Sequence, residues 1–432
     1  MAVPVVETVE SDVELPAAVD VAIIGGGIAG LTTAMELLER GLSVGVFEKG
    51  VIAGEQSGRN WGWCRKMGRD SREVPLSKIS LDLWAAMDKR IGGETGFTRC
   101  GIAYLCQTPK QMASREKWHA EQAVPNGLST HLFGAAEAKE LAPNSSVEWA
   151  GGLITPDDGR AEPQKAVPAM ARYIRAQGGQ IFQNCAVRDI EKSAGAVSGI
   201  ITERGTVACK NVVLAGGAWS RRFAHNIGVR LPQIMVQNNV FATTPVRSQL
   251  QTSVAGGGVA VRRRADGGFT IGDDTYNTAD FLPDYIRLAG AFLPTLRDNW
   301  RDFRFRIGPR FLEEAKLKRR WKPDEVSPFE QVRVLDPAPQ KKINEKSFET
   351  LRRIHPEFRE AKISHQWAGA IDVVPDVVPV ISDVSAIPGF FMLTGLSGHG
   401  FGLGPGAGKL MAELLTNETP CVDPTPFRLD RF

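Results

Sequence analysis

Residues 21–30, VAIIGGGIAG, constrain the fold of this chain more than any other part of its sequence. An apolar run ends in a glycine-rich turn, a helical pattern follows, and a second apolar run ends at Glu48. This succession predicts a strand, a turn, a helix and a second strand, the unit that binds the diphosphate of a dinucleotide. Gly25 permits the sharp turn, Gly27 lets the backbone approach a pyrophosphate, and Gly30 lets the helix pack closely on the strand. Glu48 stands 23 residues after Gly25, near the spacing of ~20 expected for a carboxylate that binds a ribose hydroxyl.

The composition narrows the class of protein. At 432 residues the chain exceeds the ~250–300 residues that one hydrophobic core usually serves, so we expect two structural parts. A formal net charge of +3 is too small to indicate a nucleic-acid-binding protein. The six cysteines include no C-x-x-C pair, so we expect neither a disulfide framework nor a metal site. Residues 1–18 lack the basic start and apolar centre of a signal peptide or membrane anchor, and they predict a short disordered lead-in to a cytoplasmic protein.

Four further features favour FAD over NAD, which shares the same adenosine diphosphate half. The nucleotide-binding unit begins near residue 20 of a long chain, where flavoproteins of this class usually carry it. The loop 53–60, AGEQSGRN, is polar and contains glycines, which suits a ribityl chain and a ring. The segment 215–219, AGGAW, closes another apolar strand at the same predicted sheet edge. The segment 397–408, SGHGFGLGPGAG, is a glycine-rich turn that leads into a helix, whose N-terminus can stabilise negative charge on a reduced flavin.

The order of these elements predicts an α/β fold. We expect a Rossmann-like FAD-binding domain and a second, α+β substrate domain that contains a large mixed or antiparallel sheet. The predicted FAD-binding domain consists of residues 19–95, 150–228 and 365–432. The predicted substrate domain consists of residues 96–149 and 229–364, with a basic helical insertion at 278–328.

Four strings of the sequence resemble the FAD-dependent D-amino-acid oxidase superfamily, which includes glycine and sarcosine oxidases. They are 52–59 (IAGEQSGR), 184–188 (NCAVR), 213–221 (VLAGGAWSR) and 423–432 (DPTPFRLDRF). The resemblance runs from about Asp20 to the C-terminus, and within the superfamily the chain looks most like the bacterial membrane-associated L-amino-acid deaminases. It differs from them in having no N-terminal membrane helix, in residues 61–66 (WGWCRK) and in the turn 397–400 (SGHG). The last two segments are expected near the substrate, so its stereochemistry and side chain stay open.

The resemblance also implies a set of cofactor contacts. The backbone of Val187 is expected against adenine, residues 57–60 against the flavin, and residues 398–404 at its pyrimidine edge. Together with the glycine turn and the strand ends, these positions make up the predicted FAD site. Its residues are Gly25, Gly27, Ile28, Ala29, Gly30, Glu48, Lys49, Gln56, Ser57, Gly58, Arg59, Asn60, Val187, Gly216, Gly217, Trp219, Gly398, His399, Gly400, Phe401 and Gly402.

The predicted function is the FAD-dependent oxidation of the C–N bond of an amino acid. Hydride passes from the carbon that bears nitrogen to flavin N5, and the imine hydrolyses to a keto acid and ammonia, as in L-amino-acid deaminases. Electrons then pass to O₂ or to a respiratory acceptor. A D-amino acid, a secondary amine or an opine is an alternative substrate within the superfamily. A flavin monooxygenase and a non-catalytic flavoprotein subunit are alternatives of another class.

An amino-acid substrate needs a cation for its carboxylate, and arginine has the best geometry for it. Arg262 is the first candidate, because the resemblance places the carboxylate-binding arginine in residues 259–264. Strand alternation puts Arg262 and Arg264 on one face there. Arg65, five residues after the flavin loop, is the second candidate. The alternative for each is an ordinary solvated arginine or, for Arg65, a phosphate contact.

Three further side chains are candidates for the site. Asp372 lies in a segment that borders the flavin in the superfamily and could bind an ammonium group, although it could equally cap a turn or pair with an arginine. His399 stands between two glycines at the proposed flavin edge, where a flavin or substrate contact competes with a purely structural role. Trp63 could form a wall of the substrate pocket or pack in the core.

Residues 297–322 combine ten Lys and Arg residues with four acids and five interleaved aromatic residues. Such a pattern is compatible with a peripheral contact at the inner membrane or with a partner surface. A solvated helical face or a subunit contact is the simpler interpretation.

Overall fold

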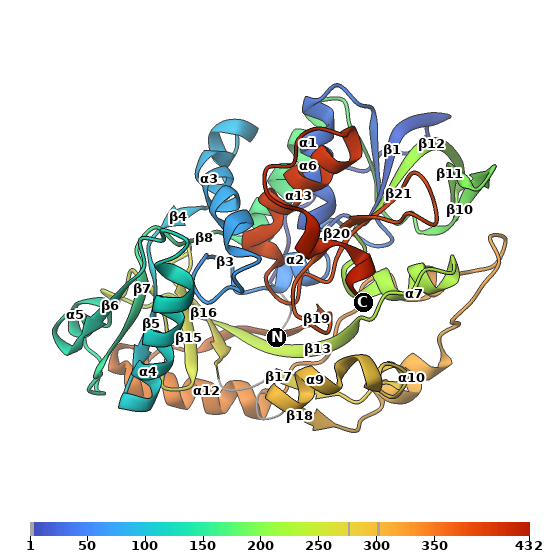
Figure 1. Cartoon of the computed structure of the whole chain (residues 1–432). Coiled ribbons are helices and arrows are strands. Elements are labelled where there is room, and N and C mark those ends of the chain that lie inside the picture. Colours follow the sequence, from blue (N-terminus) through green and yellow to red (C-terminus); the bar gives the residue numbers. More distant parts are fainter. Residues whose placement is uncertain (1–3, 275–276, 300–302) are drawn as a thin grey trace.

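The computed structural model describes residues 4–274, 277–299 and 303–432, and two large sheets organise them (Figure 1). An eight-stranded sheet occupies the upper right of Figure 1, and a ten-stranded sheet runs across its lower half. The first sheet carries helices in the Rossmann manner and the second belongs to an α+β part, so the predicted fold class is confirmed.

The first sheet takes its parallel centre from distant parts of the chain. Its strands are β1 (Ala18–Ile24), β2 (Val44–Phe47), β9 (Gln180–Phe182), β10 (Val187–Ser193), β11 (Ala196–Thr202), β12 (Gly205–Leu214), β20 (Val380–Asp383) and β21 (Phe390–Thr394). β1 pairs in parallel with β2 and β12, and β12 pairs in parallel with β21. The carboxyl ends of these four strands therefore meet at one edge, which is where open α/β sheets bind ligands.

Helices cover this sheet, and two of them pack unusually closely. The helices are α1 (Ile28–Glu39), α3 (Val74–Ile91), α6 (Pro163–Ala176) and α13 (Gly400–Thr416) (Figure 1). α13 begins at Gly400, inside the segment that we predicted as a turn. A Cβ at Gly404 or Gly408 would stand 2.5 Å from a side-chain atom of α1, and Thr32 Oγ1 donates a hydrogen bond to Gly404 O at 2.9 Å. The glycines are therefore helical, because they allow α13 to approach α1.

The second sheet is mostly antiparallel and borders the first from below. Its strands are β5 (Ile102–Cys106), β6 (His131–Gly134), β7 (Gly151–Thr155), β13 (Ile234–Thr243), β14 (Ser253–Gly256), β15 (Val259–Arg263), β16 (Phe269–Asp273), β17 (Asn277–Asp280), β18 (Phe303–Arg306) and β19 (Ile363–Val373). α12 (Lys341–Ile354) packs under it, with Phe348 and Leu351 in a buried apolar cluster. β13 and β19 pair along nearly their full lengths and bring the end of β19 toward the first sheet.

Shorter elements complete the described chain. A small sheet joins β3 (Trp63–Cys64), β8 (Gly159–Arg160) and β4 (Thr98–Arg99). The other α-helices are α2 (Gln56–Arg59), α4 (Pro109–Trp118), α5 (Ala135–Leu141), α7 (Ser220–Asn226), α8 (Pro283–Arg287), α9 (Ala289–Asn299), α10 (Arg310–Lys316) and α11 (Pro328–Gln331). α8, α9 and α10 lie in the predicted insertion, which also contributes β17 and β18 to the second sheet. Residues 300–302 of the basic segment lie outside the described residues.

The sheet pairing departs from the predicted domain ranges at two strands. β7 and the part of β19 from residue 365 onward fall within the ranges assigned to the FAD-binding domain, yet both pair in the second sheet. Their apolar runs do not tell which sheet will accept them, because that depends on pairing with strands far away in the chain.

The lead-in differs from its prediction as well. Residues 4–17 form no helix and no strand, but they lie along α6 and β9. Glu7 N donates to Gln164 O at 3.0 Å and Asp12 N donates to Ile181 O at 2.7 Å, while Arg175 pairs with Asp12. These contacts hold the described part of the lead-in in place rather than leaving it disordered.

Candidate active site

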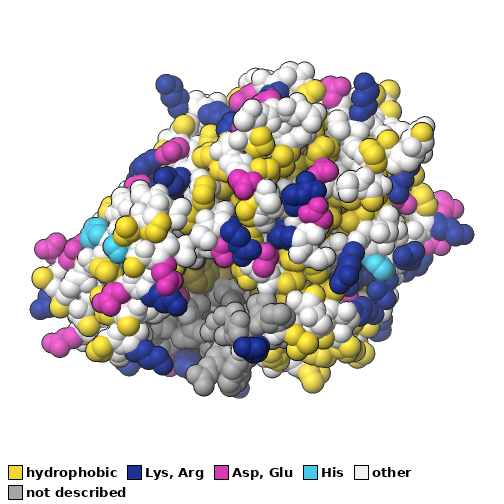
Figure 2. Space-filling model, in the orientation of Figure 1, with side chains coloured by type: hydrophobic (Ala, Val, Ile, Leu, Met, Phe, Trp, Pro, Cys, Tyr) yellow, Lys and Arg dark blue, Asp and Glu magenta, His cyan; other side chains and the backbone are white. Residues whose placement is uncertain are grey.

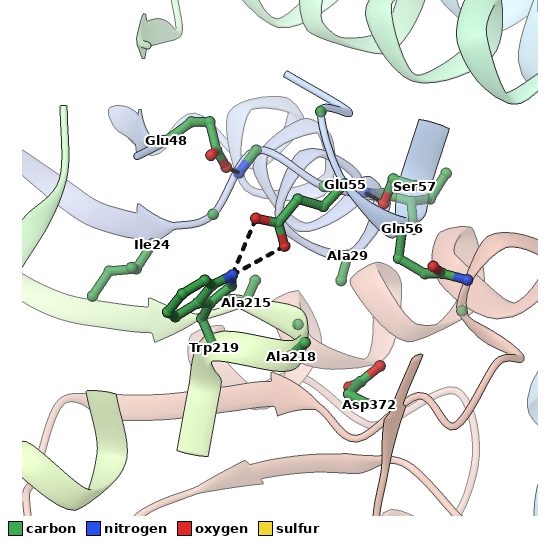
Figure 3. Close-up of a pocket in the computed structure, with 18 of the residues that line it drawn as sticks. Ile24, Ala29, Glu48, Glu55, Gln56, Ser57, Ala215, Ala218, Trp219 and Asp372 are labelled. Carbon is green, nitrogen blue, oxygen red and sulfur yellow. Dashed lines mark hydrogen bonds between the residues drawn. The ribbon is translucent and has the colours of Figure 1, made fainter. Parts of the chain in front are cut away.

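A cavity of about 1190 Å³, which counts space open to solvent, lies at the carboxyl edge of the first sheet and reaches the end of β19. It brings together residues from the glycine turn, the loop after β2, the end of β12, the end of β19 and the start of α13 (Figure 3). The predicted contacts among its lining residues are Gly25, Gly27, Ile28, Ala29, Glu48, Lys49, Gln56, Ser57, Asn60, Val187, Gly216, Gly217, Trp219, Gly398, Gly400 and Phe401. One cavity thus joins segments that are nearly 400 residues apart in the sequence.

The glycine turn has the geometry of a phosphate cradle. Gly25 has φ +116°, and a Cβ there would stand 2.4 Å from Ala215 O, so the turn packs directly against the end of β12. At Gly27, the only atoms that a Cβ would meet within 4 Å belong to the Ser57 side chain, whose Oγ accepts a hydrogen bond from Ile28 N at 2.9 Å. The first turn of the 12-residue helix α1 contains no acidic residue. An open glycine at the positive end of a helix fits a pyrophosphate.

Glu48 supports this turn through both oxygens of its carboxylate. Its Oε2 accepts from Gly26 N and its Oε1 accepts from Gly50 N, each at 2.7 Å (Figure 3). Burial raises the pKa of the Glu48 carboxyl. Each carboxylate oxygen retains a second lone pair, so the same group can also accept a ribose hydroxyl. Glu48 therefore positions the turn and still suits the predicted ribose contact.

Glu55 is a lining residue that the sequence reasoning did not include. Its carboxylate accepts from Lys49 Nζ at 2.6 Å and from Trp219 Nε1 at 3.1 Å to each oxygen (Figure 3). The Lys49 ammonium lies 4.5 Å from the centre of the Trp219 ring. These contacts hold the Trp219 ring in place in the wall of the cavity. The glycines around Glu55 predicted a cofactor-binding loop, but no sequence pattern singled out the carboxylate of Glu55.

The far end of the cavity is formed by β19, α2 and the start of α13. Asp372 Oδ2 accepts from Gly395 N at 2.8 Å, from Leu396 N at 3.2 Å and from Gln233 Nε2 at 3.1 Å. Burial raises the pKa of Asp372 to about 6 despite these bonds. Gln56 Oε1 is buried and has no hydrogen-bond partner in the described part of the chain. An unpaired acceptor and the N-terminus of the 17-residue helix α13 face the end where a flavin ring is expected.

Five predicted cofactor contacts do not line the cavity: Gly30, Gly58, Arg59, His399 and Gly402. Gly30 packs α1 on the strand, since a Cβ there would stand 2.1 Å from Gly25 O. Arg59 points away, with Nη1 donating to Asp336 Oδ1 at 2.6 Å. Gly402 O accepts from Ser80 Oγ at 2.7 Å and from Trp84 Nε1. These residues support the walls of the cavity.

The candidate arginines occupy different surroundings. Arg262 is buried, and its guanidinium donates to Glu162 Oε1 at 2.9 Å, to Ala161 O at 3.0 Å and to Thr270 Oγ1 at 3.1 Å. It does not line the cavity. Arg65 is half-buried, donates from Nη1 to Met67 O and to the Tyr104 hydroxyl, and lies 5.7 Å from the centre of the Trp63 ring. Arg65 does not line the cavity either. Arg262 is already neutralised by a carboxylate, whereas the acceptors of Arg65 among the described residues are neutral.

His399 and Trp63 flank the start of α13 on the side of Arg65. His399 Nδ1 lies 3.1 Å from both carboxylate oxygens of Glu73. Burial, assisted by the charge of Arg69, lowers the pKa of His399. Because a carboxylate can only accept, Nδ1 of His399 carries a proton in this pair and donates it to Glu73. Trp63 is buried, and its Nε1 has no partner among the residues that the structure describes.

Comparisons with known proteins agree with this geometry. Residues 20–414 match the family described as FAD dependent oxidoreductase. The fold is similar to that of L-amino acid deaminase from Proteus myxofaciens, solved in complex with anthranilate, with a TM-score of 0.95 and 32% identity over 99% of this chain and 97% of that one. It is also similar to L-amino acid deaminase from Proteus vulgaris, with a TM-score of 0.94 and 31% identity over 99% of this chain and 100% of that one.

The chain is also similar to a curated protein of about twice its length. The 4-methylaminobutanoate oxidase (formaldehyde-forming) of Paenarthrobacter nicotinovorans is 25% identical over 431 residues, which cover 98% of this chain. The chain spans about half, 47%, of the length of that relative. The predicted superfamily and its cofactor are confirmed by the family match and by the cavity that suits a dinucleotide. The chain therefore belongs to the FAD-dependent oxidoreductase family, and FAD is the cofactor for which this cavity is built.

Proposed function

We propose that the chain oxidises the C–N bond of an amino acid, giving an imine that water converts to a keto acid and ammonia. The observation that carries this proposal is the likeness to two L-amino acid deaminases over 99% of the chain, at TM-scores of 0.95 and 0.94. When bound, the flavin supplies the hydride acceptor. The protein's own residues bind and orient the substrate and exclude water.

The hydrogen bonds of Asp372 and His399, near the far end of the cavity, support a function in oxidation rather than in acid–base catalysis by these two side chains. Asp372 is committed to the backbone of the β21–α13 connection, and His399 is committed to Glu73. Neither group stands free as a strong general base. The α13 N-terminus offers backbone N–H groups where negative charge develops on reduction. Positioning and electrostatic stabilisation are therefore the contributions that these residues can make.

The decisive experiment is anaerobic mixing of the purified yellow holoprotein with a panel of compounds, followed at the oxidised-flavin absorption band. The panel contains L- and D-amino acids, N-methyl amino acids, cyclic imino acids and opines. Bleaching by L-amino acids in particular is the expected result. Bleaching only by D-amino acids, secondary amines or opines would assign the alternative substrates. Bleaching by NADPH alone would favour a monooxygenase, and bleaching by none of them would favour a non-catalytic flavoprotein subunit.

The electron acceptor needs a separate assay. We propose O₂ or a respiratory quinone as the acceptor and distinguish them by reoxidising the bleached protein with each in turn. Rapid return of colour in air indicates an oxidase. A slow return in air and a rapid return with quinone indicate a dehydrogenase.

A peripheral membrane contact through residues 297–322 is also proposed for a cytoplasmic protein. No helix of the described chain is long and apolar enough to cross a bilayer. Exposed Ile286, Leu293, Ile307 and Leu312 lie on or beside α8, α9 and α10, where Figure 2 shows hydrophobic side chains gathered at the lower right. Co-sedimentation with anionic liposomes at low salt tests this contact, and protein that stays in the supernatant contradicts it.

A further inference from the structure

Arg69 is a buried cation whose guanidinium is incompletely hydrogen-bonded in the described part of the protein. It is 4% exposed, and its Nε and Nη1 are buried without a partner among the described residues. Burial, followed by the like charge of Arg65, lowers the pKa of Arg69 to about 10. A buried guanidinium with unpartnered donors is costly, so a structure that retains one indicates a site for an anion.

Two carboxylates whose charges act on Arg69, those of Glu73 and Asp158, accept their hydrogen bonds from other groups. Glu73 accepts from His399, and Asp158 accepts from Lys66 N at 2.8 Å and Met67 N at 3.2 Å. Burial raises the pKa of Asp274 to about 6, and the charges of Arg115 and Arg65 act against that rise. Arg115 in turn lies 4.4 Å from the centre of the Tyr104 ring. The cluster of Arg65, Arg69 and Arg115 therefore offers more donors than the surrounding carboxylates use.

This cluster adjoins the flavin end of the cavity. The backbone of Cys64 and Arg65 lies against α13, since a Cβ at Gly402 would stand 3.0 Å from Cys64 Cα and 3.2 Å from Arg65 N. His399, whose pKa is lowered in part by Arg69, is flanked by Gly398 and Gly400, which line the cavity. Arg65 and Arg69 do not line the cavity themselves, but Arg69 is close enough for its charge to act on His399, whose two neighbours in the chain do line it.

We propose that Arg69, assisted by Arg65, binds the carboxylate of the substrate. Arg262 cannot readily do so, because Glu162 already occupies its buried guanidinium at 2.9 Å. Arg69 has free Nε and Nη1 donors and sits beside a second arginine, which together suit the two oxygens of a carboxylate. This inference rests on the proposed function for the identity of the ligand, but the anion site itself can be tested without turnover.

The test measures ligand binding to the oxidised holoenzyme by perturbation of the flavin absorption spectrum. The probes are benzoate and benzamide, which differ in charge but hardly in shape. In Arg69→Met, the Kd of benzoate should rise by about 30-fold or more, because a buried charge pair is lost. The Kd of benzamide should stay within about twofold. Arg69→Lys should recover part of the benzoate affinity, and Arg99→Met, an exposed arginine on β4, should change neither.

A stability measurement separates this role from a structural one. Removing a buried cation with unpartnered donors should raise the thermal unfolding midpoint of the ligand-free holoenzyme, while the increase that benzoate causes should disappear. Arg69→Met with a lower midpoint and unchanged benzoate affinity would overturn the inference. So would equal losses for benzoate and benzamide, or loss of benzoate binding in Arg262→Met instead.

The variants also cover a folding failure and separate this inference from the proposed function. If Arg69→Met does not fold, Arg65→Met and Arg69→Lys must each weaken benzoate and leave benzamide unchanged, and failure to do so overturns the inference. A protein that binds benzoate through Arg69 but is reduced by no amino acid contradicts the proposed function alone. A protein that amino acids reduce, and whose Arg69→Met variant keeps wild-type benzoate affinity, contradicts this inference alone.

Discussion

Gly27 shows how a single missing side chain shapes the cofactor site. A Cβ at this position would stand 2.9 Å from Ser57 Oγ and 3.9 Å from Ser57 Cβ, and it would meet no other described residue beyond its chain neighbours within 4 Å. Alanine at residue 57 therefore removes the clash, and it also removes the hydrogen-bond acceptor of Ile28 N. The rest of the space around Gly27 belongs to the cavity, where the pyrophosphate is expected.

We expect the double variant Gly27→Ala/Ser57→Ala to fold as well as Ser57→Ala but to bind FAD roughly tenfold more weakly, about 1.4 kcal/mol. The added methyl group projects toward the diphosphate, whereas the single variant loses only the acceptor of Ile28 N. Fluorescence titration of the FAD-free proteins measures both affinities. Equal affinities of the two variants would show that Gly27 does not face the diphosphate.

Asp372 contributes a second effect at the scale of one residue. Its pKa of about 6 lies above the usual value of 3.8, because burial outweighs its three hydrogen bonds. A raised carboxyl pKa gives stability that is complete below pH ~4 and lost as the pH rises through 6. Raising the pH from 4 to 8 should therefore lower the unfolding free energy of the FAD-free wild type relative to that of FAD-free Asp372→Asn. The expected change is up to about 3 kcal/mol. Urea unfolding at both pH values checks this, and a constant difference would place the Asp372 pKa near its ordinary value.

At the scale of elements, the α1–α13 contact depends on glycine more than on helix propensity. A Cβ at Gly408 would stand 2.5 Å from Thr32 Oγ1 and 2.6 Å from Thr32 C, which belongs to the backbone of α1. We expect Gly408→Ala to lower the unfolding free energy by about 1–3 kcal/mol, although alanine is the better helix former by ~1 kcal/mol. Gly290→Ala in α9 is the matched control, because no described atom outside its chain neighbours and its own helix backbone lies within 4 Å of the added Cβ. Thermal unfolding should show Gly290→Ala as neutral or slightly stabilising, and the same result for Gly408→Ala would mean that α13 can move away from α1.

Sequence patterns predicted some of the elements around the cofactor site but not how all of them pack. The spacing of Gly25, Gly27 and Gly30 predicted β1, α1 and β2, because a phosphate turn requires those residues locally. The same kind of local pattern predicted a turn in the glycine-rich segment 397–408. Its glycines face Ile28, Thr32 and Ser80, contacts that appear only once α13 has been packed on α1 and α3.

For the whole molecule, acid stability is expected to depend on His355. This side chain is 2% exposed and burial lowers its pKa to about 4 from 6.5, with Glu357 Oε1 3.9 Å from Nδ1. A lowered histidine pKa gives stability that is complete above pH 6.5 and lost as the pH falls to 4, because the unfolded chain takes up the proton first. We expect His355→Gln to lose less stability than the wild type over this range, by up to roughly 3 kcal/mol.

Urea unfolding of the FAD-free proteins at pH 7, 5.5 and 4.5 measures this difference. Asp372 has the opposite slope over part of the same range, so the comparison must be made between variants rather than on the wild type alone. Parallel curves for His355→Gln and the wild type would contradict the prediction.

The sequence alone determined the parts of this protein that depend on local backbone requirements. The glycine turn, the acid at the end of β2, the cofactor and the family follow from residues whose spacing is set by one strand–turn–helix unit and a few adjoining loops. The tertiary structure decided which charged groups remain available. Arg262 and Glu162 are 100 residues apart and neutralise each other, while Arg69, which no motif marks, is buried with Nε and Nη1 unpartnered among the described residues. Whether a charge is paired depends on what the fold places beside it, and no local pattern encodes that neighbour.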